Sequence, residues 1–169
     1  MKIVLIVIGV LVLVVLGVVA VGAMLPKRHV ASRTATYKAS PEKLFALIAG
    51  KQNWRPDVTA SEQLTKDGMQ FQRETGKHGD TILYALENSN PPVSIQRRIA
   101  TQNLPYGGTW NFVLEPVNGG TQVRITEDGE VYNPLFRFVS KFVMGQTATM
   151  DAYLKAMGKA VGEDVQPGN

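Results

Sequence analysis

Residues 133–162 read NPLFRFVSKFVMGQTATMDAYLKAMGKAVG, a segment typical of one long amphipathic helix. Asn133 supplies a side-chain cap, Pro134 fits the first helical position, and Gly162 fits the end of the helix. The side chains that recur at helical spacing on one face are Leu135, Val139, Phe142, Gln146, Thr149, Tyr153, Met157 and Ala160. We therefore predict one helix over 134–161 that needs an apolar surface to cover.

A series of short strands upstream provides such a surface. Strand-like alternation predicts runs at 58–65, 69–74, 81–87, 93–100, 109–116 and 121–132. Turn-forming residues separate the runs, so neighbouring strands are expected to pair antiparallel. A further strand is expected at 29–37. It is followed by a helix that begins at Ser40-Pro41-Glu42 and ends at Gly50. Residues 54–56 are expected to be either irregular or a single helical turn, because Pro56 disfavours helix in the residue before it.

The order of these elements and the turn residues between them resemble the SRPBCC superfamily. That superfamily includes START lipid-transfer domains, birch-pollen-allergen-like proteins and polyketide cyclase/dehydrase-like proteins. The segments that carry the resemblance are SPEKLF (40–45), NPP (90–92), YGGTW (106–110), GGT (119–121) and TEDGEV (126–131). The resemblance implies an α+β helix-grip fold of order β-α-α-β6-α, in which a curved antiparallel sheet of about seven strands wraps round the C-terminal helix. It also implies a cavity for hydrophobic ligands between them.

The N-terminal segment is apolar from Ile3 to Leu25, and as a helix rising about 1.5 Å per residue it would reach about 33 Å. That length suffices for a hydrocarbon core of about 30 Å, so we predict a transmembrane anchor that contacts the lipid bilayer. A cleaved signal peptide is the alternative, but its apolar region is usually shorter, about 7–15 residues. The expected organisation is an anchor at 1–26, a helix-grip domain at 27–162 and a disordered tail at 163–169.

Charge bears on orientation and on partners. The chain has 18 Lys+Arg and 14 Asp+Glu, a net charge of +4, and several basic residues closely follow the apolar segment. Lys27, Arg28 and Arg33 outnumber Lys2 on the other side, which favours a single-pass cell-membrane protein with a cytoplasmic domain. No basic run interleaved with aromatic residues follows, so we expect no nucleic-acid partner. The sequence indicates no particular protein partner.

Period-two alternation assigns strand side chains to the helix-facing side of the sheet. From these and from the C-terminal helix we predict twelve cavity residues, namely Phe71, Arg73, Tyr84, Ile95, Arg97, Trp110, Phe112, Ile125, Glu127, Phe142, Met150 and Tyr153. Arg97 lies between two isoleucines, so it requires a carboxylate, a water-filled cavity or an anionic ligand group. A simple hairpin would place Arg97 opposite Phe112 and close to Glu127, and we expect Arg97 to hold the polar head of an amphiphilic ligand.

Signals for catalysis are sparse. The chain has no cysteine, and His29 and His78 have no evident partner in the sequence. We predict no metal site and no cofactor, and no catalytic residue is assigned. Gly145 interrupts the long helix and indicates either a close approach to the sheet or a bend that widens the cavity.

Three functions remain open. The first is a membrane-anchored domain that binds a hydrophobic or lipid-like small molecule without transforming it. The second is a cyclase/dehydrase-like enzyme, for which Arg97, Glu127 and Tyr84 would be the titratable candidates. The third is an interaction module for another membrane protein, in which side chains would fill the cavity.

Overall fold

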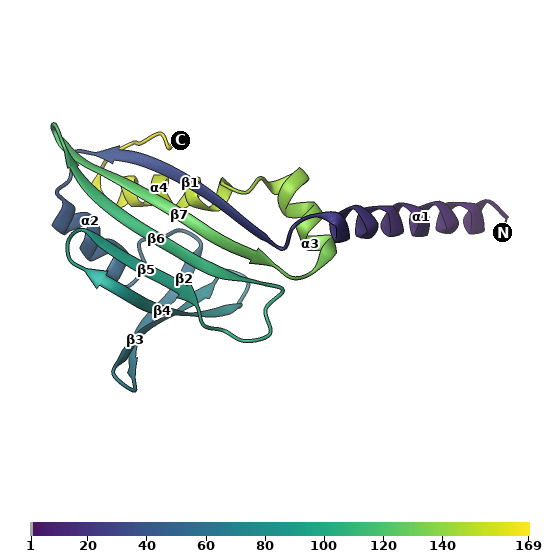
Figure 1. The fold of residues 1–169 in the computed structure, drawn as a ribbon, viewed down its shortest axis with the longest axis horizontal. Coiled ribbons are helices and arrows are strands. Elements are labelled where there is room, and N and C mark those ends of the chain that lie inside the picture. Colours follow the sequence, from purple (N-terminus) through teal and green to yellow (C-terminus); the bar gives the residue numbers. More distant parts are fainter. Residues whose placement is uncertain (1) are drawn as a thin grey trace.

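The computed structural model describes residues 2–169 and shows one helix projecting from a domain of strands and helices (Figure 1). In chain order the elements are α1 (Lys2–Met24), β1 (Arg28–Tyr37), α2 (Pro41–Ala49), β2 (Val58–Lys66), β3 (Met69–Gly76), β4 (Thr81–Asn90), β5 (Ser94–Ile99), β6 (Tyr106–Val117), β7 (Gly120–Val131), α3 (Pro134–Val139), the π-helical turn η1 (Ser140–Met144) and α4 (Ala148–Val161).

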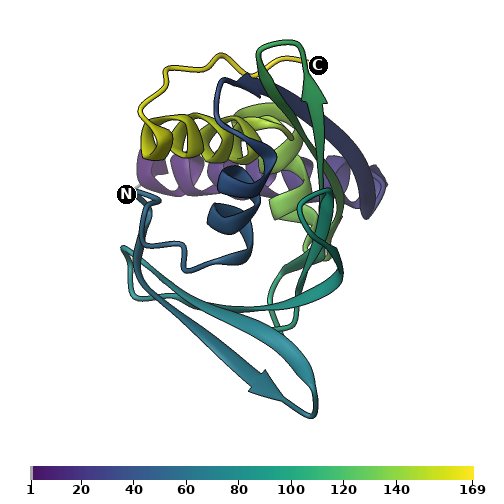
Figure 2. The ribbon, with the colours of Figure 1, turned by 90° about the vertical axis from the view of Figure 1, so that its left-hand side faces the viewer.

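The strands form one antiparallel sheet in the order β1-β7-β6-β5-β4-β3-β2. Strands β2 to β7 are successive neighbours, because short turns connect them, and β1 closes the series by pairing with β7. The sheet curves around α2 and α4 (Figure 2). The predicted helix-grip fold is therefore confirmed.

Helix α2 begins and ends where the sequence predicts. The Ser40 hydroxyl accepts a hydrogen bond from the Lys43 amide, Pro41 occupies the first turn, and Gly50 follows the last helical residue. Of the two alternatives for residues 54–56, the structure shows the irregular one and not a helical turn. Two successive turns occupy this region, in which the Arg55 amide donates to the Gln52 carbonyl and the Val58 amide donates to the Arg55 carbonyl.

The C-terminal helix is interrupted, which corrects the prediction of one helix over 134–161. Gly145 adopts φ +78° and ψ 145°, a conformation that is essentially restricted to glycine. The chain therefore leaves the helical path after η1, and only α4 packs in the concave face of the sheet. Helix α3 packs against α1 instead (Figure 1).

The core lies where α4 and α2 cover the middle of the sheet. The core side chains with no more than about one per cent exposure are Tyr37, Leu44, Ile48, Phe112, Leu114, Val123, Ile125, Met150, Leu154 and Met157. The Tyr37 hydroxyl donates a hydrogen bond of 2.9 Å to the Leu154 carbonyl. This bond joins β1 to α4 and satisfies a polar group that burial would otherwise leave unpaired.

The C-terminal segment 163–169 packs on β1, so the prediction of a disordered tail is wrong. The Thr34 amide donates to the Gly168 carbonyl and the Gly168 amide donates to the Thr34 carbonyl, both at 2.9 Å. The Glu163 carboxylate accepts from the Lys38 and Ala39 amides at 2.7 and 3.0 Å. Backbone pairing and a buried Val165 hold the tail in place.

Candidate functional site

A cavity of about 530 Å³ lies at one end of the sheet. We call this the proximal end, because β1 begins there at Arg28, three residues beyond α1, and β7 ends beside it at Val131. The distal end is the opposite one, where β6 turns into β7. The proximal cavity is lined from the sheet by His29, Ile82, Tyr84, Arg97, Ile99, residues 106–110, Glu127, Glu130 and Val131, and from the loops and helices by Arg55, Asp57, Phe136, Val139, Ser140, Gly145, Gln146 and Thr149.

The break in the C-terminal helix creates this space. Helix α4 begins only at Ala148 and α3 packs against α1, so no helix among residues 2–169 fills the concave face at the proximal end. Among the residues that the structure describes, no atom outside the glycine and its chain neighbours lies within 4 Å of the position a Gly145 Cβ would take. Of the two roles open to Gly145, the structure therefore shows the bend that widens the cavity, not a close approach to the sheet.

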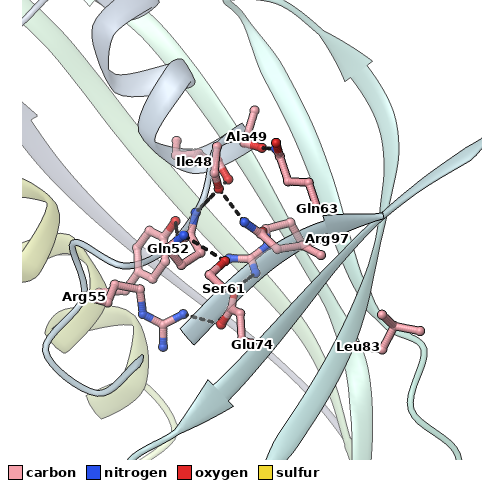
Figure 3. A network of polar contacts seen from close by, with 12 residues as sticks. Ile48, Ala49, Gln52, Arg55, Ser61, Gln63, Glu74, Leu83 and Arg97 are labelled. Atoms are coloured by element: carbon pink, nitrogen blue, oxygen red, sulfur yellow. Dashed lines mark hydrogen bonds and ion pairs between the residues drawn. The ribbon is translucent and has the colours of Figure 1, made fainter. Parts of the chain in front are cut away.

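Three charged side chains from distant parts of the chain form a buried network at the cavity wall (Figure 3). The Glu74 carboxylate of β3 accepts a hydrogen bond from Arg55 Nη1 at 2.9 Å and another from Arg97 Nη2. Arg97 is only 4% exposed and Glu74 only 5%. One buried carboxylate thus faces two guanidinium groups, and the Nε of Arg97 has no hydrogen-bond partner among the residues described.

A second layer of polar groups supports the network. The Gln52 side chain donates to the carbonyls of Leu47, Ile48 and Gly50, and it accepts a 3.0 Å bond from the buried Tyr153 hydroxyl. Gln52 thereby ties the end of α2 to α4 beside the charges.

Tyr84 lies against this network on the cavity wall. The Arg97 guanidinium carbon is 4.5 Å from the centre of the Tyr84 ring, which is cation–π geometry. Burial, with Glu74 adding to it, raises the pKa of the Tyr84 hydroxyl to about 12, although Arg97 and Arg55 act in the opposite direction. The hydroxyl therefore stays protonated at neutral pH and is a hydrogen-bond donor within the cavity.

His29 and Glu127 approach each other on the neighbouring strands β1 and β7. His29 Nε2 is 3.7 Å from Glu127 Oε1, and both side chains are largely buried. Burial raises the pKa of Glu127, while His29 and the Trp110 indole N–H act to lower it. An acid–base pair thus lines the cavity, separated from Arg97 by β6 and its Trp110 side chain.

The structure distributes the twelve predicted cavity residues over four environments. Tyr84, Arg97, Trp110 and Glu127 line the cavity. Ile95, Phe112, Ile125, Met150 and Tyr153 belong to the packed core instead. Phe142 is 57% exposed, because η1 has left the sheet.

The other two, Phe71 and Arg73, lie on the opposite face of β3. Gln72 and Glu74 point inward there, and Arg73 pairs with the exposed Glu62 of β2 at 3.1 Å. The prediction that Phe71 and Arg73 face the helix is therefore wrong, because the other set of alternating residues on β3 points inward. The inward polar side chains have partners elsewhere in the chain, which hydrophobicity alone does not reveal.

The predicted Arg97 register also needs correction. Arg97 lies opposite Trp110, and Ile95 lies opposite Phe112, a shift of two residues from the simple hairpin. The carboxylate that Arg97 binds is Glu74 rather than Glu127.

Sequence reasoning missed Arg55, Glu74 and His29. The Arg55 loop and β3 meet only in the folded chain, so no local pattern marks them. His29 could have been found, because pairing of the first strand with the last places it beside Glu127. Among residues 2–169, no group of three or more histidine or acidic side chains is arranged to hold a metal ion.

Comparison with known proteins assigns the family. A sequence model described as "Polyketide cyclase / dehydrase and lipid transport" matches residues 28–162, nearly the whole chain beyond α1. The chain belongs to this family. The resemblance to the SRPBCC superfamily drawn from the sequence is thus confirmed. A search of curated protein sequences finds no match.

Solved structures support the same fold. A START superfamily protein from Mycobacterium smegmatis superposes with a TM-score of 0.61 at 16% identity, over 79% of this chain and 97% of that one. Norcoclaurine synthase from Thalictrum flavum gives 0.60 at 11% identity, over 79% and 86% of the two chains. The di-domain ARO/CYC StfQ from the steffimycin biosynthetic pathway gives 0.60 at 12% identity, over 77% of this chain and 50% of that one. At these identities the likeness concerns the fold.

Proposed function

We propose that this chain is a membrane-anchored domain that binds a hydrophobic or lipid-like small molecule in the proximal cavity. The observation that carries the proposal is an open volume of about 530 Å³ whose walls combine apolar side chains with a few converging polar groups. This combination is typical of small-molecule sites. Ile82, Ile99 and Trp110 would contact the apolar body of the ligand.

The polar group of the ligand would lie at Arg97 and Tyr84. Among the residues described, Arg97 retains a buried N–H without a partner, and Tyr84 can donate a hydrogen bond. Two guanidinium groups share the buried Glu74 carboxylate, and Arg55 also pairs with the exposed Asp57. An anionic or strongly hydrogen-bond-accepting head group suits this environment. The ligand class is therefore an amphiphile with an acidic or carbonyl-rich head.

The anchoring part of the proposal rests on α1. This helix has 23 residues from Lys2 to Met24 and is long and apolar enough to cross a membrane. Its apolar side chains are exposed along almost its whole length, as expected for a helix whose partner is lipid. The basic residues after α1 favour a cytoplasmic domain. Digestion of the domain by a protease added outside intact cells would contradict that orientation.

Native mass spectrometry of the detergent-extracted full chain tests ligand binding. We expect a bound amphiphile in the unmodified protein and its loss in Ile99→Trp, because the indole would occupy the cavity. Val117→Trp, at the distal end of the same sheet, is the matched control and should retain the ligand. Equal ligand content in both variants, or none in the unmodified protein, would remove the basis for a bound molecule.

Arg97 and its neighbour Arg98 offer a second matched pair. Arg98 is exposed and binds Glu87 on the outer face of the sheet, so Arg98→Ala should leave ligand retention unchanged. Arg97→Lys keeps a positive charge opposite Glu74 but removes the guanidinium fork, and it should weaken retention. Unchanged retention in Arg97→Lys and in Arg97→Ala would contradict a role for Arg97 in holding the head group.

The His29–Glu127 pair favours a second candidate function, a cyclase/dehydrase-like enzyme. Two titratable groups at 3.7 Å within a cavity provide the acid and base that such proton transfers require. To test for enzyme activity, the extracted ligand is incubated with the unmodified protein and with Glu127→Gln, and the masses of the products are measured by mass spectrometry. A change of mass that needs Glu127 supports catalysis, and an unchanged ligand supports binding alone.

An interaction module for another membrane protein is the weakest of the three functions. It required a cavity filled by side chains, and the proximal end of the sheet is open.

A further inference from the structure

The segment between the sheet and α4 exposes apolar side chains that no part of the described chain covers. Leu135 and Phe136 of α3 are 43% and 48% exposed, and Phe142 and Val143 of η1 are 57% and 71% exposed. We call these four residues the α3 surface. Leu135 and Phe142, like Phe136 and Val143, are seven residues apart, which places them on one side of the helix after two turns. The sequence predicted that Leu135 and Phe142 face the sheet, and the structure exposes both.

The α3 surface is held at a fixed position beside the last turn of α1. Arg137 Nη1 donates hydrogen bonds to the carbonyls of Gly22, Ala23 and Leu25 at 3.2, 3.4 and 2.9 Å, and Nη2 donates to Tyr132 at 3.0 Å. These carbonyls lie at the C-terminal end of α1, where backbone hydrogen bonding within the helix is incomplete, although the Gly22 carbonyl also accepts from the Leu25 amide at 3.3 Å. The buried guanidinium therefore caps α1 and complements its dipole. A Cβ at Gly22 would overlap the Pro134 carbonyl, so the two backbones are in close contact.

This position lies at the depth where a membrane-spanning α1 would leave the hydrocarbon. With 23 residues at about 1.5 Å each, α1 is about 34 Å long and spans a hydrocarbon core of about 30 Å with little to spare. Its end at Met24 then marks the boundary of the lipid, and α3 packs against that end. Exposed Lys27 and Lys141 flank the apolar side chains, as suits the head-group region.

We propose that the α3 surface is inserted into the bilayer interface beside α1, so that the domain contacts lipid through two elements. The proposal rests on the anchoring by α1 given above, and it goes further by assigning lipid as the occupant of an apolar face otherwise left in water. Phe136 belongs both to this surface and to the cavity lining. The lining therefore continues into the lipid-facing side chains, and an amphiphile passes between bilayer and cavity along Phe136.

Because the chain has no cysteine, single labels test the proposal cleanly. The full-chain variants Phe142→Cys and Val143→Cys are each labelled with a nitroxide and reconstituted in vesicles of phosphatidylcholine and phosphatidylglycerol. The accessibility of each nitroxide is then measured. Both sites are exposed, so the substitutions should preserve the fold. We expect collisions with oxygen, which concentrates in lipid, to exceed those with a water-soluble nickel chelate several-fold. Val117→Cys at the distal end is the control and should show the reverse.

Two further outcomes are decisive. The proposal would be overturned if labels at 142 and 143 were as accessible to the nickel chelate as the label at 117. It would also be overturned if both labels collided rarely with both reagents, as they would beneath a protein partner. Val12→Cys within α1 separates this failure from failure of the anchor. A lipid-exposed label at Val12 with water-exposed labels at Phe142 and Val143 refutes the α3 contact alone, whereas a water-exposed label at Val12 refutes both.

Discussion

The distal and proximal ends of the sheet differ in what fills their concave side. Toward the distal end, α2 and α4 pack on β6 and β7, and side chains such as Phe112, Leu114 and Val123 have essentially no exposure. At the proximal end, the same two strands carry Trp110 and Glu127, and the neighbouring β5 carries Arg97, around a cavity of about 530 Å³. Gly145 marks the boundary between the packed distal end and the open proximal end, because the helical segment that fills the distal end is interrupted there.

The comparison shows that the sheet itself does not decide where the cavity forms. Strands β6 and β7 run through both ends without interruption. The covering helix determines which part becomes core and which part stays open. Stability is therefore expected to depend on distal residues and binding on proximal ones.

The largest expected effect comes from Phe112→Ala in the filled region. Removal of a fully buried aromatic side chain typically costs about 3–5 kcal/mol of unfolding free energy. Val139→Ala, which shortens a half-buried cavity-lining side chain, should cost less than about 1 kcal/mol. Denaturant titration in detergent, followed by the fluorescence of Trp54 and Trp110, measures both. Equal losses would contradict the division of the sheet into a packed end and an open end.

The next effect concerns the buried charges at the boundary between the two ends. Glu74→Ala leaves Arg55 and Arg97 buried without their shared carboxylate, and breaking such a network costs about 3 kcal/mol or more. The control Glu62→Ala breaks the exposed pair with Arg73 on the outer face, which is worth at most about 1 kcal/mol. A loss for Glu74→Ala no greater than that for Glu62→Ala would show that water or a ligand already compensates the two arginines.

Gly145→Ala tests the break itself. An alanine at φ +78° and ψ 145° is strained, so we expect a loss of about 1–3 kcal/mol, or relaxation of the segment toward helix with a smaller cavity and less bound ligand. Gly168→Ala is the matched control, because that glycine has open space around it and no positive φ. Urea unfolding and ligand content by native mass spectrometry report the two consequences. The same result in both variants would mean that the break does not depend on glycine.

The smallest effect is a pH dependence at the proximal end. Burial raises the pKa of Glu127 in the folded state, so the folded chain holds this proton more tightly than the unfolded chain. The stabilising contribution is therefore present below the unfolded pKa and is lost as pH rises through the folded one. Glu127→Gln should remove this loss of stability with rising pH without affecting the distal core. If the unmodified protein and Glu127→Gln showed the same free energy of unfolding at every mildly acidic pH, this contribution of Glu127 would be excluded.

Sequence patterns predicted the parts of this molecule that local physics determines. Ser40 and Pro41 mark the start of α2, and alternation on β5 placed Arg97 inward, because neighbouring isoleucines define the buried face. The pattern failed on β3, where Gln72 and Glu74 are buried with partners from elsewhere in the chain. It failed again after Pro134, since an apolar stripe does not reveal whether its partner is the sheet or something outside the domain.

The short connection between α1 and β1 has a mechanical consequence. Only residues 25–27 join the two elements, a span of at most about 10 Å when extended, and Arg137 further fastens the domain to the helix end. With α1 in a bilayer, the domain cannot travel to a second membrane as a free carrier does. If the cavity binds a lipid-like molecule as proposed, the domain would receive it from the adjacent leaflet and release it to an acceptor that reaches this membrane.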